Sequence, residues 1–246
     1  MDTLDRLIEI LCKERGEKVP FLDNNQKENF FRCLCNIREP KPISDEFILL
    51  QNKYLRNKNK NINSINNLNY ENQIALFKGD ITTLNADAIV NAANSQMLGC
   101  FHPLHNCIDN IIHSKAGVQL RLECNDIMKG NTAKNGEVII TKGYNLPCTY
   151  VFHTAGPIVN DKVTKDNIKD LEKCYLNCLK KADELNLNTI AFCCISTGVF
   201  GYPKEDAAKV AVRLVQKYLK ETKSKLKVIF DVYTEEDYEI YSNILK

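Results

Sequence analysis

The spacing of apolar residues divides the chain into a helical beginning and a longer part in which strands and helices alternate. Residues 1–52 repeat apolar side chains at helical spacing, as Leu4, Leu7 and Leu11 do on one face. A second helical pattern follows and ends before Pro40. No strand pattern occurs here, so we expect a helical N-terminal extension.

The next stretch, residues 53–72, is rich in asparagine and lysine. It carries too little apolar surface to offset the entropy cost of ordering. We therefore expect an exposed connection between the extension and the rest of the chain.

From residue 73 to residue 246, short apolar runs alternate with amphipathic helical patterns. The expected strands are 74–77, 88–91, 137–141, 150–154, 189–195 and 227–233. Such alternation predicts an α/β domain with helices on both faces of a sheet. Ligands bind at the carboxyl ends of the strands in such domains, so the loops at those ends are the places to search for chemistry.

Composition and charge narrow the classes of function. Of the 246 residues, 44% are apolar and 26% charged, as in soluble globular proteins. Lys and Arg number 33 against 31 Asp and Glu, which disfavours nucleic acid and anionic membrane as partners. Acids interrupt the first apolar residues and no apolar run reaches about 18 residues, so we expect a cytoplasmic protein. The 11 cysteines are an odd number, and we expect most to be reduced core residues.

Two loops after expected strands carry polar side chains that could hold a ligand. Asp80 stands directly after a strand and could accept hydrogen bonds from an amino group, although a helix cap or turn is the structural alternative. Asn91 and Asn94 enclose two alanines after the next strand. Their amides could bind sugar hydroxyls, and a polar turn is the alternative there.

A third loop has the properties of a phosphate-binding loop. It lies between a buried strand and a helix expected to begin at Pro203, so its backbone amides and the positive helix end point to one place. Its residues are Ser196, Thr197, Gly198, Val199, Phe200, Gly201 and Tyr202. Because neither a Walker loop nor a GxGxxG fingerprint occurs, backbone amides rather than a lysine would hold phosphates; a tight turn is the alternative.

Residues 99–113 carry the strongest chemical signal, since three of the four histidines of the chain fall there. Cys100, His105 and Cys107 form the set of two thiolates and one imidazole that suits zinc. His102 could replace His105 on spacing alone, and buried cysteines beside an exposed histidine would need no metal. With three protein ligands, the zinc ion would keep one position for water or substrate, as in catalytic sites.

Taken together, five short motifs resemble the macrodomain family. They are GDIT (79–82), NAAN (91–94), GYNLP (143–147), HTAGP (153–157) and STGVFGYP (196–203). The loop GCFHPLHNCIDN replaces the glycines that precede an aspartate in common macrodomains. In this it is similar to the zinc-containing protein-ADP-ribosyl hydrolases, a bacterial branch often encoded beside a sirtuin-like ADP-ribosyltransferase. The resemblance implies a three-layer α/β/α macrodomain with a central mixed sheet over residues 73–246.

The resemblance also implies roles for the candidate residues. Asp80 and Ile81 would contact adenine, Ser196–Tyr202 would hold the diphosphate, and Tyr233 would provide an aromatic wall. One zinc ion on the cysteine and histidine ligands would face the distal ribose. Asn91 and Asn94 would contact the ligand, with Asn94 fixing the distal ribose, and Asp109 would orient or deprotonate the attacking water. A purely ligand-binding role is the alternative for Asp109.

The function implied is a zinc-dependent hydrolase that removes mono-ADP-ribose from protein side chains, with aspartate and glutamate as the expected acceptors. A reader module that binds ADP-ribose without cutting it is the alternative, because fold alone does not separate the two. The zinc loop and Asp109 favour the enzyme, and the balanced charge disfavours RNA binding. From the branch alone, a lipoylated carrier protein and a sirtuin-like ADP-ribosyltransferase are expected partners. We expect a monomer.

Overall fold

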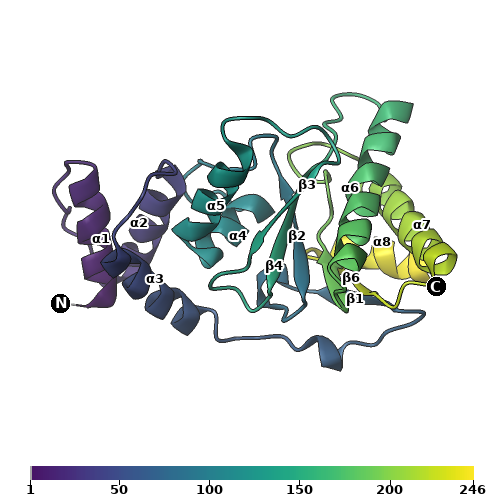
Figure 1. Cartoon of the computed structure of the whole chain (residues 1–246), viewed down its shortest axis with the longest axis horizontal. Coiled ribbons are helices and arrows are strands. Elements are labelled where there is room, and N and C mark those ends of the chain that lie inside the picture. The colour runs from purple at the N-terminus through teal and green to yellow at the C-terminus, as the bar shows by residue number, and fades with distance from the viewer. Residues whose placement is uncertain (1) are drawn as a thin grey trace.

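Six strands form one mixed sheet in the order β1-β6-β5-β2-β4-β3 (Figure 1). The structure is a computed structural model that describes residues 2–246. Neighbouring strands are parallel except β3, which pairs antiparallel with β4 at one edge. The strands are β1 (Ile74–Lys78), β2 (Ala88–Ala93), β3 (Val138–Lys142), β4 (Tyr150–Ala155), β5 (Thr189–Phe192) and β6 (Lys227–Val232).

Helices cover both faces of the sheet, so the predicted three-layer α/β/α architecture is confirmed (Figure 1). On one face lie α4 (Ile108–Ala116) and α5 (Val118–Met128). On the other face lie α6 (Lys165–Glu184), α7 (Lys204–Thr222) and α8 (Glu235–Leu245). Because both faces are covered, the inner strands read as nearly continuous apolar runs. Tyr175 of α6 packs against Phe192 of β5 with ring centroids 4.9 Å apart, and both side chains are fully buried.

The bounds of β2 and β5 differ from the sequence pattern by more than one residue, and those of the other four strands differ by one residue at one or both ends. Strand β5 ends at Phe192 instead of residue 195, because the chain leaves the sheet there and Ser196 adopts a left-handed backbone with φ of 67°. Strand β2 continues to Ala93, two residues further than expected, since its pairing with β4 extends to Ala155. Both changes occur at the carboxyl ends of strands, where the candidate loops begin.

The N-terminal extension consists of three helices, α1 (Thr3–Glu14), α2 (Asn24–Ile37) and α3 (Asp45–Lys58). Helix α3 starts at the N-cap Ser44, whose Oγ accepts a hydrogen bond from Phe47 N at 3.3 Å. It continues six residues into the stretch expected to be a connection. Its last turns are held by apolar contacts, because Leu55 is buried and the ring of Tyr54 lies edge-on to that of Phe31.

The extension has its own small core, and that core includes one residue of the α/β domain. Its buried members are Leu4, Leu7, Ile8, Leu11, Cys12, Phe31, Leu34, Phe47 and Val118. Val118 lies at the start of α5. The extension is therefore packed on the α/β domain through an apolar contact as well as through hydrogen bonds.

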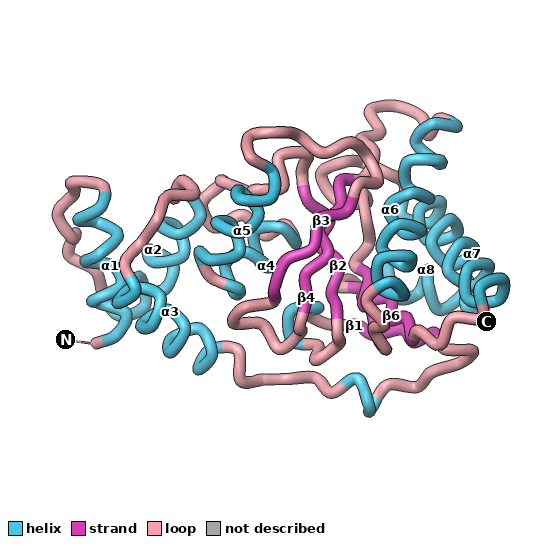
Figure 2. Tube along the Cα trace, viewed as in Figure 1, coloured by secondary structure: helices cyan, strands magenta, loops and turns pink. Residues whose placement is uncertain are grey.

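The connection from the extension to β1 crosses the α/β domain as a loop with one short 3-10 turn, η1 (Ile65–Asn67) (Figure 2). Several contacts attach it to the domain. The side-chain amide of Asn59 donates to two carbonyls of the domain, and Asn63 N donates to Thr83 O at 2.9 Å. Across residues 2–246, none of the helices combines the length and apolar character that crossing a membrane requires.

Candidate active site

The carboxyl ends of four neighbouring parallel strands bring the predicted ligand-binding residues to one edge of the sheet. Asp80 follows β1, Tyr233 follows β6, the loop Ser196–Tyr202 follows β5, and Asn94 follows β2. These strands are adjacent in the order β1-β6-β5-β2. The residues therefore form a row along the edge, in the order in which they are named here.

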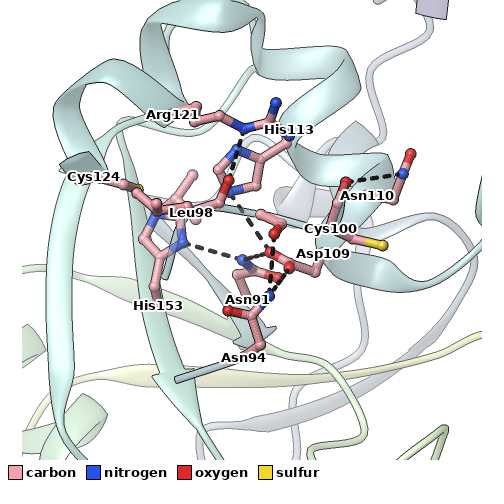
Figure 3. Close-up of polar contacts among 12 residues, drawn as sticks. Asn91, Asn94, Leu98, Cys100, Asp109, Asn110, His113, Arg121, Cys124 and His153 are labelled. Atoms are coloured by element: carbon pink, nitrogen blue, oxygen red, sulfur yellow. Dashed lines mark hydrogen bonds and ion pairs between the residues drawn. The ribbon is translucent and has the colours of Figure 1, made fainter. Parts of the chain in front are cut away.

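At the β2 end of this row, two asparagines contact a buried carboxylate (Figure 3). Asn91 Nδ2 donates to Asp109 Oδ1 at 2.7 Å, and Asn94 Nδ2 lies 3.5 Å from Asp109 Oδ2. Asp109 lies in the first turn of α4 and its side chain is almost fully buried. Burial raises the pKa of Asp109 to about 6, although the hydrogen bond from Asn91 acts in the opposite direction.

Asn91 is itself held from behind by His153 of β4. Asn91 Nδ2 lies 3.1 Å from His153 Nδ1, so Nδ1 acts as the acceptor. The ring hydrogen of His153 is then on Nε2, which donates to Thr141 Oγ1 at 2.9 Å. Burial lowers the pKa of His153 to about 3, which keeps the ring neutral. Asn91 is fully buried, and its side chain positions Asp109. Its Oδ1 has no hydrogen-bond partner within residues 2–246 and is buried as well, so Asn91 supports the site from beneath instead of contacting a ligand as the sequence predicts.

His113 lies one helical turn after Asp109 on α4, with its Nε2 3.6 Å from Asp109 Oδ1. Burial lowers its pKa well below the usual value, and His153 and Arg121 add to this effect, so the contact is not an ion pair. His113, Cys124 and His153 do bring donor atoms within 4.8 Å of one another. Both nitrogens of His153 are already engaged in hydrogen bonds, however, so we assign this cluster to packing beneath Asp109.

A second donor cluster lies in the loop before α4. Cys100 Sγ, Cys107 Sγ and a ring nitrogen of His105 all lie within 4.8 Å of one another, and His102 is not part of the group. The distance from Cys100 Sγ to His105 Nδ1 is 3.5 Å. A tetrahedral zinc ion would place sulfur and nitrogen ligands about 3.6 Å apart, so the donor types and this spacing fit zinc. Burial raises the pKa of the Cys107 thiol to about 11, while the backbone N–H of Asn110 favours the thiolate.

The loop Ser196–Tyr202 offers backbone amides, as the sequence predicts. Within residues 2–246, no carbonyl accepts from the amides of Gly198, Val199 or Phe200. The turn is closed behind them, because Tyr202 N donates to Ser196 O at 3.0 Å. Three successive free amides in the turn that precedes α7 are suited to an anion.

Other features of this loop differ from the prediction. Helix α7 begins at Lys204, with Pro203 as its N-cap, one residue later than expected. The side chains of Ser196 and Tyr202 are buried, so these two residues form the base of the loop and would contact a ligand only through the backbone. Val199 points to solvent, with 81% of its surface accessible.

At the β1 end, Asp80 forms a helix cap, which is the structural alternative to a role in ligand binding. Its Oδ1 accepts from Thr82 N at 3.0 Å and caps the short helix η2 (Ile81–Thr83), and its Oδ2 accepts from Lys115 Nζ at 2.5 Å. Partial burial opposes ionisation of Asp80, but hydrogen bonds from Lys115 and Thr82 prevail and lower its pKa. An adenine amino group would have to share this carboxylate with Lys115.

The other two residues predicted to contact adenine differ in exposure. The side chain of Ile81 is buried in the core, so it would face a ligand only through its backbone. Tyr233 has 80% of its surface exposed, and its ring is free to cover a planar group.

Comparison with known proteins places this arrangement in a family. A family profile described as Macro domain matches residues 90–211. A curated Protein-ADP-ribose hydrolase of Staphylococcus aureus strain MRSA252 is 46% identical, over 97% of this chain and 93% of the relative. The chain belongs to the macro domain family.

Solved macrodomains agree with this assignment. The Trypanosoma brucei macrodomain in complex with ADP-ribose is 32% identical with a TM-score of 0.68, covering 84% of this chain and 92% of that protein. The Oceanobacillus iheyensis macrodomain with ADP is 36% identical with a TM-score of 0.63, covering 70% of this chain and 89% of the other. The macrodomain fold is therefore shown over most of the chain.

Two residues with contacts at this macrodomain site, Arg121 and Lys115, were not predicted from the sequence. Arg121 of α5 is buried, and its guanidinium lies over the ring of Phe101 at 4.2 Å from the centroid. Its burial could have been predicted from spacing, because Arg121 lies three residues from both Val118 and Cys124 on the buried face of the helix. Lys115 reaches Asp80 across a long stretch of sequence, and no local pattern predicts that contact.

Proposed function

We propose that this macrodomain is a zinc-dependent hydrolase that removes mono-ADP-ribose from protein side chains, with aspartate and glutamate esters as its substrates. The hydrolase class follows from the curated relatives, which are named Protein-ADP-ribose hydrolase. The observation that carries the proposal is the position of Asp109 beside the donor cluster. Cys107 is the N-cap of α4 and Asp109 lies in its first turn. Asn94 connects the two, because its Nδ2 donates to Gly99 O at 3.1 Å and also lies near Asp109.

The row of residues along the sheet edge supports ADP-ribose as the bound group. Tyr233 and Asp80 lie at one end, the free amides of the β5 loop in the middle, and Asn94 with Asp109 at the other end. This order corresponds to adenine, diphosphate and distal ribose. The Trypanosoma brucei relative with ADP-ribose supports the same ligand here.

The chemistry follows from the residues at the distal end of this row. Scission of the bond from ribose to the acceptor builds oxocarbenium-like charge on the sugar. Asp109, held by Asn91 and Asn94, is placed to orient a water molecule and accept its proton. A zinc ion on Cys100, His105 and Cys107 would supply a Lewis acid for an oxygen of the ribose or of the acceptor.

The identity of the target protein rests on the loop GCFHPLHNCIDN alone. From its similarity to the zinc-containing branch, we propose a lipoylated carrier protein as target and a sirtuin-like ADP-ribosyltransferase as the enzyme that modifies it. We also propose that the protein acts in the cytoplasm as a monomer. Comparing release from a modified lipoylated carrier with release from an unrelated modified protein tests the target, and equal rates on both would contradict it.

The experiment that tests the activity measures release of ADP-ribose from a protein mono-ADP-ribosylated on aspartate or glutamate. We expect the zinc-loaded protein to release it, and we expect Cys107→Ser to lose both zinc and activity. Asp109→Asn keeps the zinc ligands and should reduce release by about 10²- to 10⁴-fold. Cys33→Ser is the matched control, because Cys33 is a half-buried cysteine of α2 outside the donor cluster.

The reader alternative gives a different result in the same experiment. A reader would bind ADP-ribose and zinc but release nothing from any linkage. Full activity in zinc-free protein would contradict the zinc dependence while leaving the hydrolase intact.

A further inference from the structure

The N-terminal extension contacts the loop that carries the cysteine and histidine donors. We propose that helix α2 clamps this donor loop, defined as residues 100–107, in the shape that a metal ion requires, and that Arg32 and Asn36 are its positioning residues. The consequence for catalysis rests on the proposed zinc dependence. The clamp itself concerns the shape of the loop and is measurable without metal.

The donor loop needs external support because it has little structure of its own. Residues 98–107 form neither helix nor strand. Leu104 adopts a left-handed backbone with φ of 55°, a conformation that costs energy for a residue with a side chain. His105, the donor that follows it, is exposed to solvent. Without further contacts, this loop would sample several shapes and its three donors would separate.

Arg32 of α2 holds the loop at His105. Its Nη2 donates to the carbonyl oxygen of His105 at 2.6 Å and to Asn110 Oδ1 at 2.8 Å. Its Nε donates to Ser114 Oγ at 3.3 Å. One guanidinium thus joins the backbone of a donor residue to the helix that carries Cys107 and Asp109.

Asn36 of α2 holds the loop at its strained residue. Its Oδ1 accepts from Leu104 N at 3.0 Å, and its Nδ2 donates to Ser114 Oγ at 3.0 Å. The side chain of Asn36 is almost fully buried, so this contact is shielded from water. Asn110 adds a third contact from α4, since its Nδ2 donates to His102 O at 2.8 Å.

The position of α2 is fixed in turn by Arg121 of α5. Its Nη1 donates to the carbonyl oxygens of Cys35, Asn36 and Arg38 at 3.0, 2.9 and 2.6 Å. These are carbonyls at the end of α2, which lack partners within the helix. Arg121 Nε donates to Leu98 O at 2.7 Å, two residues before the donor loop. The end of α2 and the start of the loop are therefore held by the same buried side chain.

Contacts of this kind behind the ligands of a metal determine how tightly the metal is held. Loss of such outer contacts typically weakens metal affinity by about 10- to 100-fold. We therefore expect Arg32→Ala and Asn36→Ala to release zinc to a chromogenic chelator at least about tenfold faster than the native protein. Asn36→Asp keeps the acceptor for Leu104 N and should retain most of the affinity.

The experiment compares these variants with Arg56→Ala as the matched control. Arg56 lies exposed on α3 of the same extension, and its side chain has no hydrogen bond or ion pair to the residues described, 2–246. Three quantities are measured on the full chain: the rate of zinc transfer to the chelator, the visible spectrum of the cobalt-substituted protein, and amide hydrogen exchange in the zinc-free protein. The spectrum reports ligand geometry, which a general loss of stability would not alter.

The clamp predicts that Arg32→Ala alters the cobalt spectrum. In the zinc-free Arg32→Ala variant, it predicts faster amide exchange at residues 100–107 and native exchange in β2. In the Arg56→Ala control, it predicts native exchange in both segments. Unchanged exchange in the donor loop together with native zinc release would overturn the clamp. A different result is that the native protein is active without zinc, while Arg32→Ala still increases amide exchange in the donor loop. That result would contradict the zinc dependence and support the clamp.

Discussion

Asp231 illustrates how a single buried residue affects stability without taking part in the proposed chemistry. It lies in β6 with its side chain buried, and its Oδ1 has no hydrogen-bond partner in the described part of the chain. Burial raises its pKa well above the usual value, and the nearby carboxylate of Asp80 adds to this effect. Ionisation of Asp231 therefore favours the unfolded chain.

The sign of the resulting pH dependence follows from linkage. The contribution of Asp231 to stability is complete below its unfolded pKa of about 3.9, and it is lost as the pH rises towards the folded pKa. Asp231→Asn removes the charge and should raise the free energy of unfolding at pH 8 by about 1–3 kcal/mol, with a smaller gain at pH 5. Urea unfolding at both pH values measures this difference.

The matched control for that measurement is Asp161→Asn. Asp161 is exposed, so its replacement should change the free energy of unfolding little at either pH. A gain for Asp231→Asn that is the same at pH 5 and pH 8 would show that the carboxyl group does not titrate in this range.

At the scale of elements, the two glycines of the loop Ser196–Tyr202 have different roles: Gly201 packs closely against the fold, and Gly198 borders open space. A Cβ atom added at Gly198 would meet open space, whereas one at Gly201 would approach Val159 O at 2.7 Å. Gly201 also has a φ of 69°, which a side chain disfavours. The backbone conformation and the close contact therefore require glycine at position 201, whereas at position 198 a side chain would fit but would occupy the space beside the free amides.

Substitution of each glycine should have a different result. We expect Gly198→Val to fold with native stability, within about 0.5 kcal/mol, and to bind ADP-ribose at least about tenfold more weakly, because its side chain fills the space beside the free amides. Gly201→Ala should lower the free energy of unfolding by about 1–3 kcal/mol. Calorimetric titration with ADP-ribose and thermal unfolding measure the two effects. Native affinity in Gly198→Val would place the diphosphate elsewhere.

The elements of the α/β domain were largely predictable because their signals are local. The four inner strands β2, β4, β5 and β6 are runs that both faces of the sheet bury, and such runs stand out from the polar loops. The edge strands β1 and β3 are apolar runs that are partly buried. The end of β5 was not predictable in the same way. Cys193 and Ile195 continue the apolar run and are buried, but the chain has already left the sheet to form the loop that begins at Ser196.

The candidate site was predictable only in part, for a related reason. Cys100, His105 and Cys107 are close in sequence, so their composition alone indicates a donor cluster. The pairing of Asp80 with Lys115 and the contact of Arg32 with His105 join distant parts of the chain. Contacts of this kind depend on how the layers pack, so they cannot be predicted from the spacing of residues in the sequence.

At the scale of the whole molecule, the extension and the α/β domain share an interface that should make them unfold together. Val118 of α5 belongs to the core of the extension, and Gln51 of α3 accepts a hydrogen bond from Val118 N at 3.0 Å. Arg121 bonds to three carbonyls of the extension. Opening the extension alone would expose these groups, so its separate unfolding carries a large cost.

Native-state hydrogen exchange tests this cooperativity. We expect the slowest amides of α1 and of β2 to exchange with the same free energy of opening in the native protein. Val118→Asp places a charge in the core of the extension and should lower the opening free energy of α1 by about 2–4 kcal/mol, while β2 changes less. Ile127→Asp is the matched control on α5, since Ile127 is exposed. If the amides of α1 already exchange faster than those of β2 in the native protein, the extension opens independently, and zinc release should then follow the opening rate of α2.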